Sequence, residues 1–144
     1  MGTLAYIPQR SDRRMTHLTV EHRISPAAGA SAPAAARRWL DEHLAHFGLP
    51  KRIGEDARLV LSELVTNAIR HGRPEIDVTL SMRPDRLRIA VRDGGEGLPV
   101  LNAAATDALR AGGRGLMIVA ATTVDWGVLA DGAGKTVWAE IAVG

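Results

Sequence analysis

Two neighbouring stretches with a two-residue period constrain the fold of this chain more than any other feature. In EIDVTLSM (residues 75–82) and RLRIAVRD (residues 86–93), apolar side chains occupy alternate positions. This alternation is typical of β-strands with one buried face. The turn sequence at residues 83–85 lies between them and predicts an antiparallel hairpin. The apolar positions are Ile76, Val78, Leu80, Met82, Leu87, Ile89 and Val91.

The other face of this hairpin is polar, so we expect water on one face of the sheet and a helical cover on the other. The expected cover is a pair of amphipathic helices at about residues 32–47 and 54–71. Ser31 is the expected N-cap of the first helix, and Gly48 with Pro50 is expected to end it. The outward positions of the hairpin are Glu75, Asp77, Thr79, Arg86, Arg88 and Arg92.

Three further elements complete the expected fold. HLTVEHRI (residues 17–24) predicts a strand, and GRGLMIVAA (residues 113–121) predicts a helix. Residues 126–143 predict a closing hairpin that turns at Asp131-Gly132. Together these elements predict an α+β fold, a two-layer sandwich in which about three helices cover one face of a mostly antiparallel sheet.

Composition narrows the class of protein. Without cysteine the chain forms neither disulfides nor thiolate metal sites, which favours a reducing, cytoplasmic location. No apolar run is long enough to cross a bilayer, so we expect no membrane attachment. We expect a single domain over residues 17–144 after a disordered basic leader, residues 1–16, which carries the whole net charge of +2. The residues after this leader carry no net charge, and only 3% of the whole chain is aromatic. Both facts argue against binding to nucleic acid.

Polar side chains follow one flank of the second predicted helix. Glu63, Asn67 and His71 occur at four-residue steps, so Glu63 and Asn67 differ by only about 40° around the helix axis. They lie outside the apolar arc of that helix. Taken alone, this pattern is more typical of a solvated helix face, and a histidine at a helix end is more often a capping residue.

Two glycine-rich junctions follow in the sequence. Asp93 ends a predicted strand and precedes three glycines within four residues. A short carboxylate can accept a hydrogen bond from a ligand amine, and glycines allow a ligand to approach the backbone closely. Further on, the glycines around Arg114 open a predicted helix, whose N-terminus suits phosphate groups. Each pattern alone is also typical of an ordinary turn or helix start, but the three in this order support one another.

The combination resembles the ATP-binding module of the GHKL superfamily, the Bergerat fold. It is most similar to the small bacterial anti-sigma-factor serine/threonine kinases and their stand-alone ATP-binding relatives. The resemblance extends over about residues 17–143. The blocks that carry it are ELVTNAIRHG (63–72), VRDGGEGLP (91–99), GRGLMIV (113–119), and WG with GKTVWAEI (126–127 and 134–141).

The resemblance implies a role for each matching position. Asn67 would hold a Mg²⁺ ion at the nucleotide phosphates, since this ion favours oxygen ligands and needs few protein groups. Glu63 would act as the general base toward the attacking hydroxyl group. Asp93 would accept a hydrogen bond from the exocyclic amine of adenine. The remaining ATP-binding positions implied are His71, Gly95, Gly97, Leu98, Gly113, Arg114, Gly115, Leu116 and Thr136.

By this resemblance the chain is expected to use ATP, with ADP as product, to phosphorylate a STAS-domain anti-anti-sigma factor and to control a sigma factor. A homodimer is a further expectation. The chain has no residues for the extra domains of histidine kinases, gyrase-like enzymes or chaperones, which argues against those readings. One alternative stays open: a nucleotide-dependent binding switch without significant kinase activity.

Overall fold

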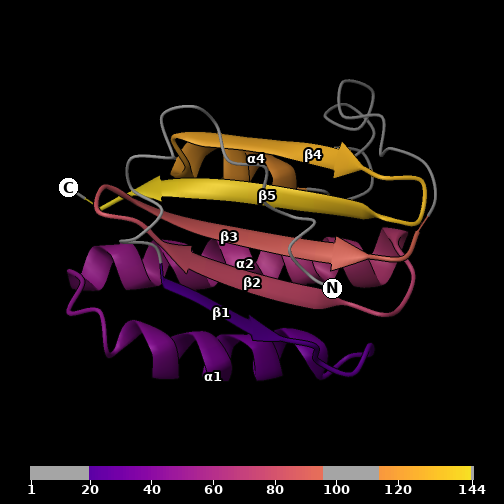
Figure 1. The fold of residues 1–144 in the computed structure, drawn as a ribbon, viewed down its shortest axis with the longest axis horizontal. Coiled ribbons are helices and arrows are strands. Elements are labelled where there is room, and N and C mark those ends of the chain that lie inside the picture. The colour runs from indigo at the N-terminus through magenta and orange to yellow at the C-terminus, as the bar shows by residue number, and fades with distance from the viewer. Residues whose placement is uncertain (1–19, 96–113, 144) are drawn as a thin grey trace.

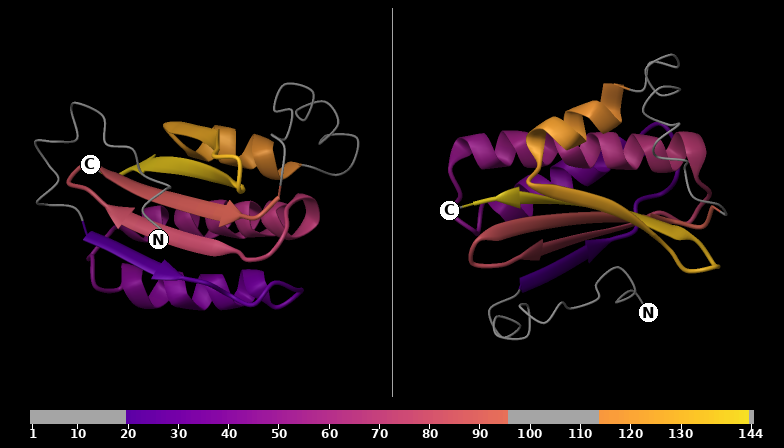
Figure 2. Two further views of the ribbon diagram at one scale, coloured as in Figure 1. Left: turned by 45° about the vertical axis from the view of Figure 1, so that its right-hand side comes forward. Right: turned by 90° about the horizontal axis from the view of Figure 1, so that it is seen from above.

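The computed structural model describes residues 20–95 and 114–143, and these residues form two layers. One layer is a five-stranded sheet in the order β1-β2-β3-β5-β4, with every neighbouring pair antiparallel. The other layer consists of helices that all lie on one face of the sheet (Figures 1 and 2). The elements are β1 (Val20–Ile24), α1 (Ala32–Leu44), α2 (Lys51–His71), β2 (Asp77–Met82), β3 (Arg86–Asp93), α4 (Arg114–Thr122), β4 (Asp125–Ala130) and β5 (Lys135–Ala142).

This architecture confirms the predicted α+β sandwich and both predicted hairpins. Met82 pairs with Leu87 across the first hairpin, and Ala130 pairs with Lys135 across the second. None of the helices in the described ranges is long and apolar enough to cross a membrane. The predicted leader, residues 1–16, and the predicted loop at 98–113 lie outside the described residues.

The core forms between α2 and the inner face of the sheet, as the alternating pattern predicts. Apolar side chains of β2, β3 and β5 meet the apolar arc of α2, and nearly all of them are fully buried. Each large aliphatic side chain removed from water contributes roughly 1.5–3 kcal/mol. The residues from the sheet are Val78, Leu80, Leu87, Ile89, Val91, Val137, Ala139 and Ile141, and those from α2 are Ile53, Ala57, Val60, Leu61, Leu64, Val65 and Ala68.

The helix boundaries differ from the predicted ones by one turn or less. Helix α1 ends at Leu44 rather than near Phe47, and the chain continues as a turn through residues 45–48. Helix α2 begins at Lys51 rather than near residue 54, because the carbonyl group of Pro50 accepts hydrogen bonds from the first turn. Ser31 occupies the N-cap position of α1, but its side chain makes no capping hydrogen bond.

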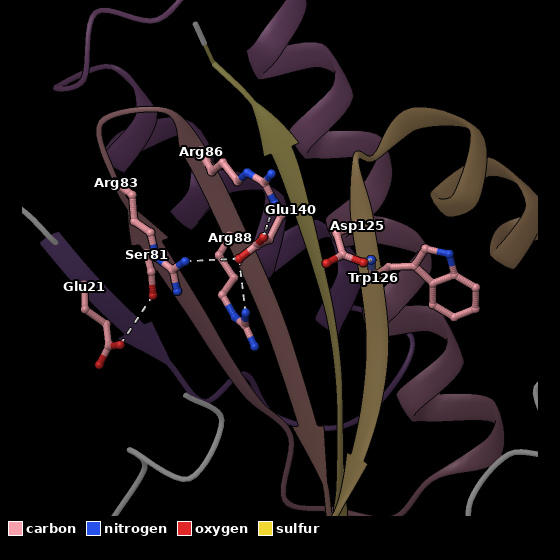
Figure 3. Close-up of polar contacts among 8 residues, drawn as sticks. All are labelled: Glu21, Ser81, Arg83, Arg86, Arg88, Asp125, Trp126 and Glu140. Carbon is pink, nitrogen blue, oxygen red and sulfur yellow. Dashed lines mark hydrogen bonds and ion pairs between the residues drawn. The ribbon is translucent and has the colours of Figure 1, made fainter. Parts of the chain in front are cut away.

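The outer face of the sheet carries a polar row that crosses all five strands. Glu21, Ser81, Arg88, Glu140 and Asp125 are register partners from β1 to β4 (Figure 3). Side chains of directly opposed strand residues lie on the same face. Within the row, Ser81 donates a hydrogen bond to Glu21 at 3.4 Å, and Arg88 donates one to Glu140 at 3.1 Å.

Glu140 is the centre of this row. Its carboxylate is 94% removed from water and contacts three guanidinium groups, from Arg83 at 3.4 Å, Arg86 at 2.8 Å and Arg88 at 3.1 Å (Figure 3). The guanidinium of Arg88 also lies 4.3 Å from the ring centre of Trp138, within the range of a cation–π contact.

Part of the outer face differs from the expectation of a wet face, which included Thr79 among its positions. Short side chains on this face are buried, with Thr79 at 7%, Ser81 at 3% and Ala90 at 3% relative exposure. Long side chains such as those of Arg88 and Trp138 lie on the same face, and the methylene stems and rings of such residues generally cover neighbouring surface.

Candidate functional site

Three chain segments meet at one edge of the sheet. Figure 1 shows the end of β3, the start of β5 and the C-terminal end of α2 at the same side of the molecule. Strands β3 and β5 are antiparallel, so the last residue of one pairs with the first residue of the other. The candidate site is built at this edge.

Asp93 is the centre of the site. It is the last residue of β3, is 1% exposed, and continues the inward-facing row of Leu87, Ile89 and Val91. Its Oδ1 atom accepts hydrogen bonds from the backbone N–H of Gly95 at 2.7 Å and of Arg73 at 3.4 Å.

The Oδ1 atom of Asp93 has a third, charged partner in Lys135. Asp93 and Lys135 are register partners across β3 and β5, and the Nζ atom of Lys135 lies 3.1 Å from Oδ1. Both side chains are almost completely buried, at 2% and 6% exposure. The Oδ2 atom of Asp93 makes no hydrogen bond within the described part of the chain.

Glycines surround this carboxylate, and their missing side chains leave room for it. A Cβ atom on Gly72 would lie 2.3 Å from Cγ of Asp93. A Cβ atom on Gly95 would lie 2.8 Å from Oδ1 of Asp93 and 2.9 Å from Nζ of Lys135. Atoms cannot approach so closely, so glycine at 72 and 95 is required by the contact with the carboxylate and not by an unusual backbone conformation.

Glu63 and Asn67 lie on α2, before the end that touches Asp93. Ser62 faces α1, where its hydroxyl accepts a hydrogen bond from Arg37 at 3.1 Å. Around the helix axis Glu63 lies about 100° and Asn67 about 140° from Ser62. Both therefore lie on the flank turned away from α1, on the side where α4 packs (Figure 2). Both side chains are partly exposed and make no hydrogen bond within the described ranges.

The other predicted positions divide into three groups. His71 is exposed at the last turn of α2. Arg114, Gly115 and Leu116 begin α4, which packs against α2. The predicted positions outside the described residues are Gly97, Leu98 and Gly113.

The structure does not bring Thr136 to Asp93. Thr136 pairs with Arg92, and Asp93 pairs with Lys135, so strand alternation places Thr136 on the outer face of the sheet. Lys135 occupies the inward position next to the Asp93 carboxylate. The sequence carries a signal for it, because Lys135 falls in phase with the apolar residues Val137 and Ala139.

Residues 26–141 match the histidine kinase-like ATPase domain family, and this match identifies the class of protein. This match covers most of the chain, so the chain belongs to that family, and the resemblance to the GHKL superfamily is confirmed. Membership in an ATPase-domain family implies binding of ATP or ADP. No curated protein matches the chain.

Among solved structures, the chain is similar to the RsbU and RsbW domains of Rv1364c from Mycobacterium tuberculosis. The similarity has a TM-score of 0.65 and 23% sequence identity and covers 85% of this chain. The chain spans 32% of the length of that longer chain. At this identity the similarity shows the fold.

Proposed function

We propose that this protein binds ATP with Mg²⁺ and transfers the γ-phosphoryl group to a serine or threonine of a STAS-domain protein, thereby controlling a sigma factor. The observation that carries the proposal is that one helix, α2, connects the Asp93 carboxylate to the side chains of Glu63 and Asn67. Helix α2 contacts the Asp93 carboxylate through Gly72 at its C-terminal end and presents Glu63 and Asn67 on one flank.

In this proposal the adenine base lies against Gly95, and its exocyclic amine donates a hydrogen bond to Oδ2 of Asp93. From Gly72, Asn67 lies about 7.5 Å back along α2, and Glu63 about 13.5 Å back. The nucleotide would therefore extend from the sheet edge along the flank of α2, with its phosphates toward Asn67 and the start of α4. An unpaired N–H group at a helix start is a suitable phosphate ligand.

The residues present fit a Mg²⁺ ion. Asn67 offers a partly exposed amide oxygen that no other described side chain engages. The described residues contain no cluster of three metal-binding side chains, which suits an ion that takes most of its ligands from phosphate oxygens and water. When bound, such an ion neutralises the negative charge of the phosphates.

Glu63 lies one turn from Asn67 and is the proposed general base. Its carboxylate would take the proton from the attacking hydroxyl group as that oxygen forms a bond to the γ-phosphorus. The bond from the γ-phosphorus to the bridging oxygen breaks, and ADP leaves with the electron pair. General-base catalysis of this kind contributes typically about 10²–10⁴ in rate.

The test is phosphate transfer from labelled ATP to candidate STAS-domain proteins. Glu63→Gln should reduce the transfer rate by about 10²–10⁴ while ATP affinity stays within a few-fold. Glu55→Gln is the matched control, because Glu55 is an exposed glutamate on the same helix, and this variant should retain the parental rate. Transfer by Glu63→Gln at the parental rate would show that Glu63 is not the base.

A second candidate function is a binding switch in which ATP and ADP change partner affinity without transfer. The observation that favours it is that the Glu63 side chain makes no hydrogen bond in the described ranges, so none of the described residues orients it as a base. Strong nucleotide-dependent binding of a STAS or sigma-factor partner, with no labelled product, would support this function over the kinase.

A further inference from the structure

Lys135 is the residue of the candidate site that the kinase proposal does not use. It is the first residue of β5 and is 5% exposed, although lysine is rarely buried to this extent. It lies in the inward row of the strand, ahead of Val137 and Ala139, where the alternating pattern calls for an apolar side chain. Its burial therefore requires compensation by polar groups.

That compensation is incomplete among the residues that the structure describes. A lysine ammonium group carries three N–H donors. Across the described residues, the Nζ atom of Lys135 makes one hydrogen bond, to Oδ1 of Asp93 at 3.1 Å. Two donors therefore remain for a group that does not belong to these residues. A Cβ atom on Gly95 would lie 2.9 Å from Nζ, so a side chain at position 95 would crowd the ammonium group.

The pair presents one acceptor and one donor side by side. Oδ2 of Asp93 is the available acceptor, because Oδ1 is occupied by Gly95, Arg73 and Lys135. The Nζ atom of Lys135 is the available donor. The edge of adenine that carries the exocyclic amine has the complementary order, with the amine as donor and the adjacent ring nitrogen N1 as acceptor.

We propose that Lys135 is a second base-recognising residue, which donates a hydrogen bond to N1 of adenine while Asp93 accepts one from the amine. This inference rests on the proposed nucleotide site and adds a specificity determinant to it. Guanine presents an acceptor where adenine has the amine and a donor at N1. It therefore meets Asp93 with an acceptor and Lys135 with a donor, and neither hydrogen bond forms.

Nucleotide analogues test this directly on the wild-type protein. Calorimetry would compare ADP with 1-deaza-ADP, which lacks the ring acceptor, and with purine riboside diphosphate, which lacks the amine. Leaving a buried polar group unpaired reduces affinity by roughly 5- to 150-fold, and we expect a loss in this range for both analogues. Equal affinity for ADP and 1-deaza-ADP would overturn the role of Lys135, and so would tighter binding of GDP than of ADP.

A variant separates base recognition from simple neutralisation of Asp93. In Lys135→Met the preference for ADP over 1-deaza-ADP should disappear, while the preference for ADP over purine riboside diphosphate remains. Lys135→Gln retains a donor and should keep part of the first preference. Lys51→Met, at an exposed lysine of α2, is the control and should behave as the wild type.

The outcomes distinguish this inference from the proposed function. If Lys135→Met keeps the full preference over 1-deaza-ADP, Lys135 is only a structural partner of Asp93, and the inference fails while the nucleotide site stands. If the wild-type protein binds no adenine nucleotide, the proposed function itself fails. The analogue comparison on the wild-type protein needs no variant, so it decides the question even if Lys135→Met does not fold.

Discussion

The α-carbon of Gly72 lies directly against the carboxyl group of Asp93, so closely that a methyl group at position 72 would be 2.3 Å from Cγ. This contact joins the end of α2 to the end of β3. It ties the helix that carries Glu63 and Asn67 to the strand that carries the proposed base acceptor, so the two halves of the site keep a fixed separation.

Gly72→Ala should therefore damage the site. The added methyl group forces either the carboxylate or the backbone to move, and overpacking of this kind typically costs about 1–3 kcal/mol of unfolding free energy. We expect a loss of at least about tenfold in ADP affinity by calorimetry. Gly54→Ala is the control, since a Cβ atom there meets only Leu44 at 3.9 Å.

Gly54→Ala should leave ADP affinity unchanged and stabilise the protein by about 0.5–1 kcal/mol, because alanine is favoured over glycine inside a helix. If Gly72→Ala binds ADP as tightly as Gly54→Ala, the contact between Gly72 and Asp93 has no part in the site.

Glu140→Gln should destabilise the fold. Three arginines surround this buried carboxylate, and the hydrogen bond that Arg86 donates to Glu140 raises the pKa of Arg86 above its usual value. Removing one partner of a buried charge pair typically costs about 3–5 kcal/mol. The Arg86 side chain is 39% exposed, which lowers this figure, so we expect about 3 kcal/mol in urea denaturation.

The control for this charge change is Asp41→Asn, which removes an exposed partner of Arg58. Exposed ion pairs are worth about 0–1 kcal/mol, so this variant should change the unfolding free energy by no more than that. A similar effect for both variants would mean that the row across the sheet does not stabilise it.

His22 should make the stability depend on pH. Burial, followed by the imidazoles of His43 and His46, lowers the pKa of His22 from its ordinary value of 6.5, and its ring lies 4.3 Å from that of His43. Below pH 6.5 the unfolded chain therefore binds a proton at His22 more readily than the folded chain does. The contribution of neutral His22 is present above pH 6.5 and is lost as the pH falls through the folded-state pKa.

Urea denaturation of the wild type and of His22→Gln at pH 7.5 and pH 5.5 measures this effect. Glutamine does not titrate, so the stability of the wild type relative to the variant should be higher at pH 7.5 than at pH 5.5. An equal difference at the two pH values would show that the environment of His22 does not disfavour its charged form.

The layers of the fold could be predicted from the sequence because they depend on local periodicity. The alternation in β2 and β3 and the apolar arc of α2 each place side chains on one face without information from distant residues. The burial of Thr79 and Ser81 could not be predicted in this way. It depends on tertiary contacts at this face, and the order of the strands cannot be read from a local pattern.

The candidate site, like the fold, could be predicted only in part from the sequence. Asp93, Asn67 and Glu63 stand out because motifs mark them, but the contact of Gly72 with Asp93 depends on how a helix end meets a strand end. The inward position of Lys135 depends on the register between β3 and β5, and an error of one residue moves the expected partner of Asp93 to Thr136.

The central claim is that one site holds the base at Asp93 and a phosphate-bound Mg²⁺ at Asn67. Calorimetric titration with ADP, in Mg²⁺ and in EDTA, tests it most directly when the wild type is compared with Asn67→Ala. The account predicts one nucleotide per chain, tighter binding in Mg²⁺, and loss of that Mg²⁺-dependent gain in Asn67→Ala with little change in EDTA. No binding of ADP to the wild type, or an equal gain from Mg²⁺ in both proteins, would contradict it.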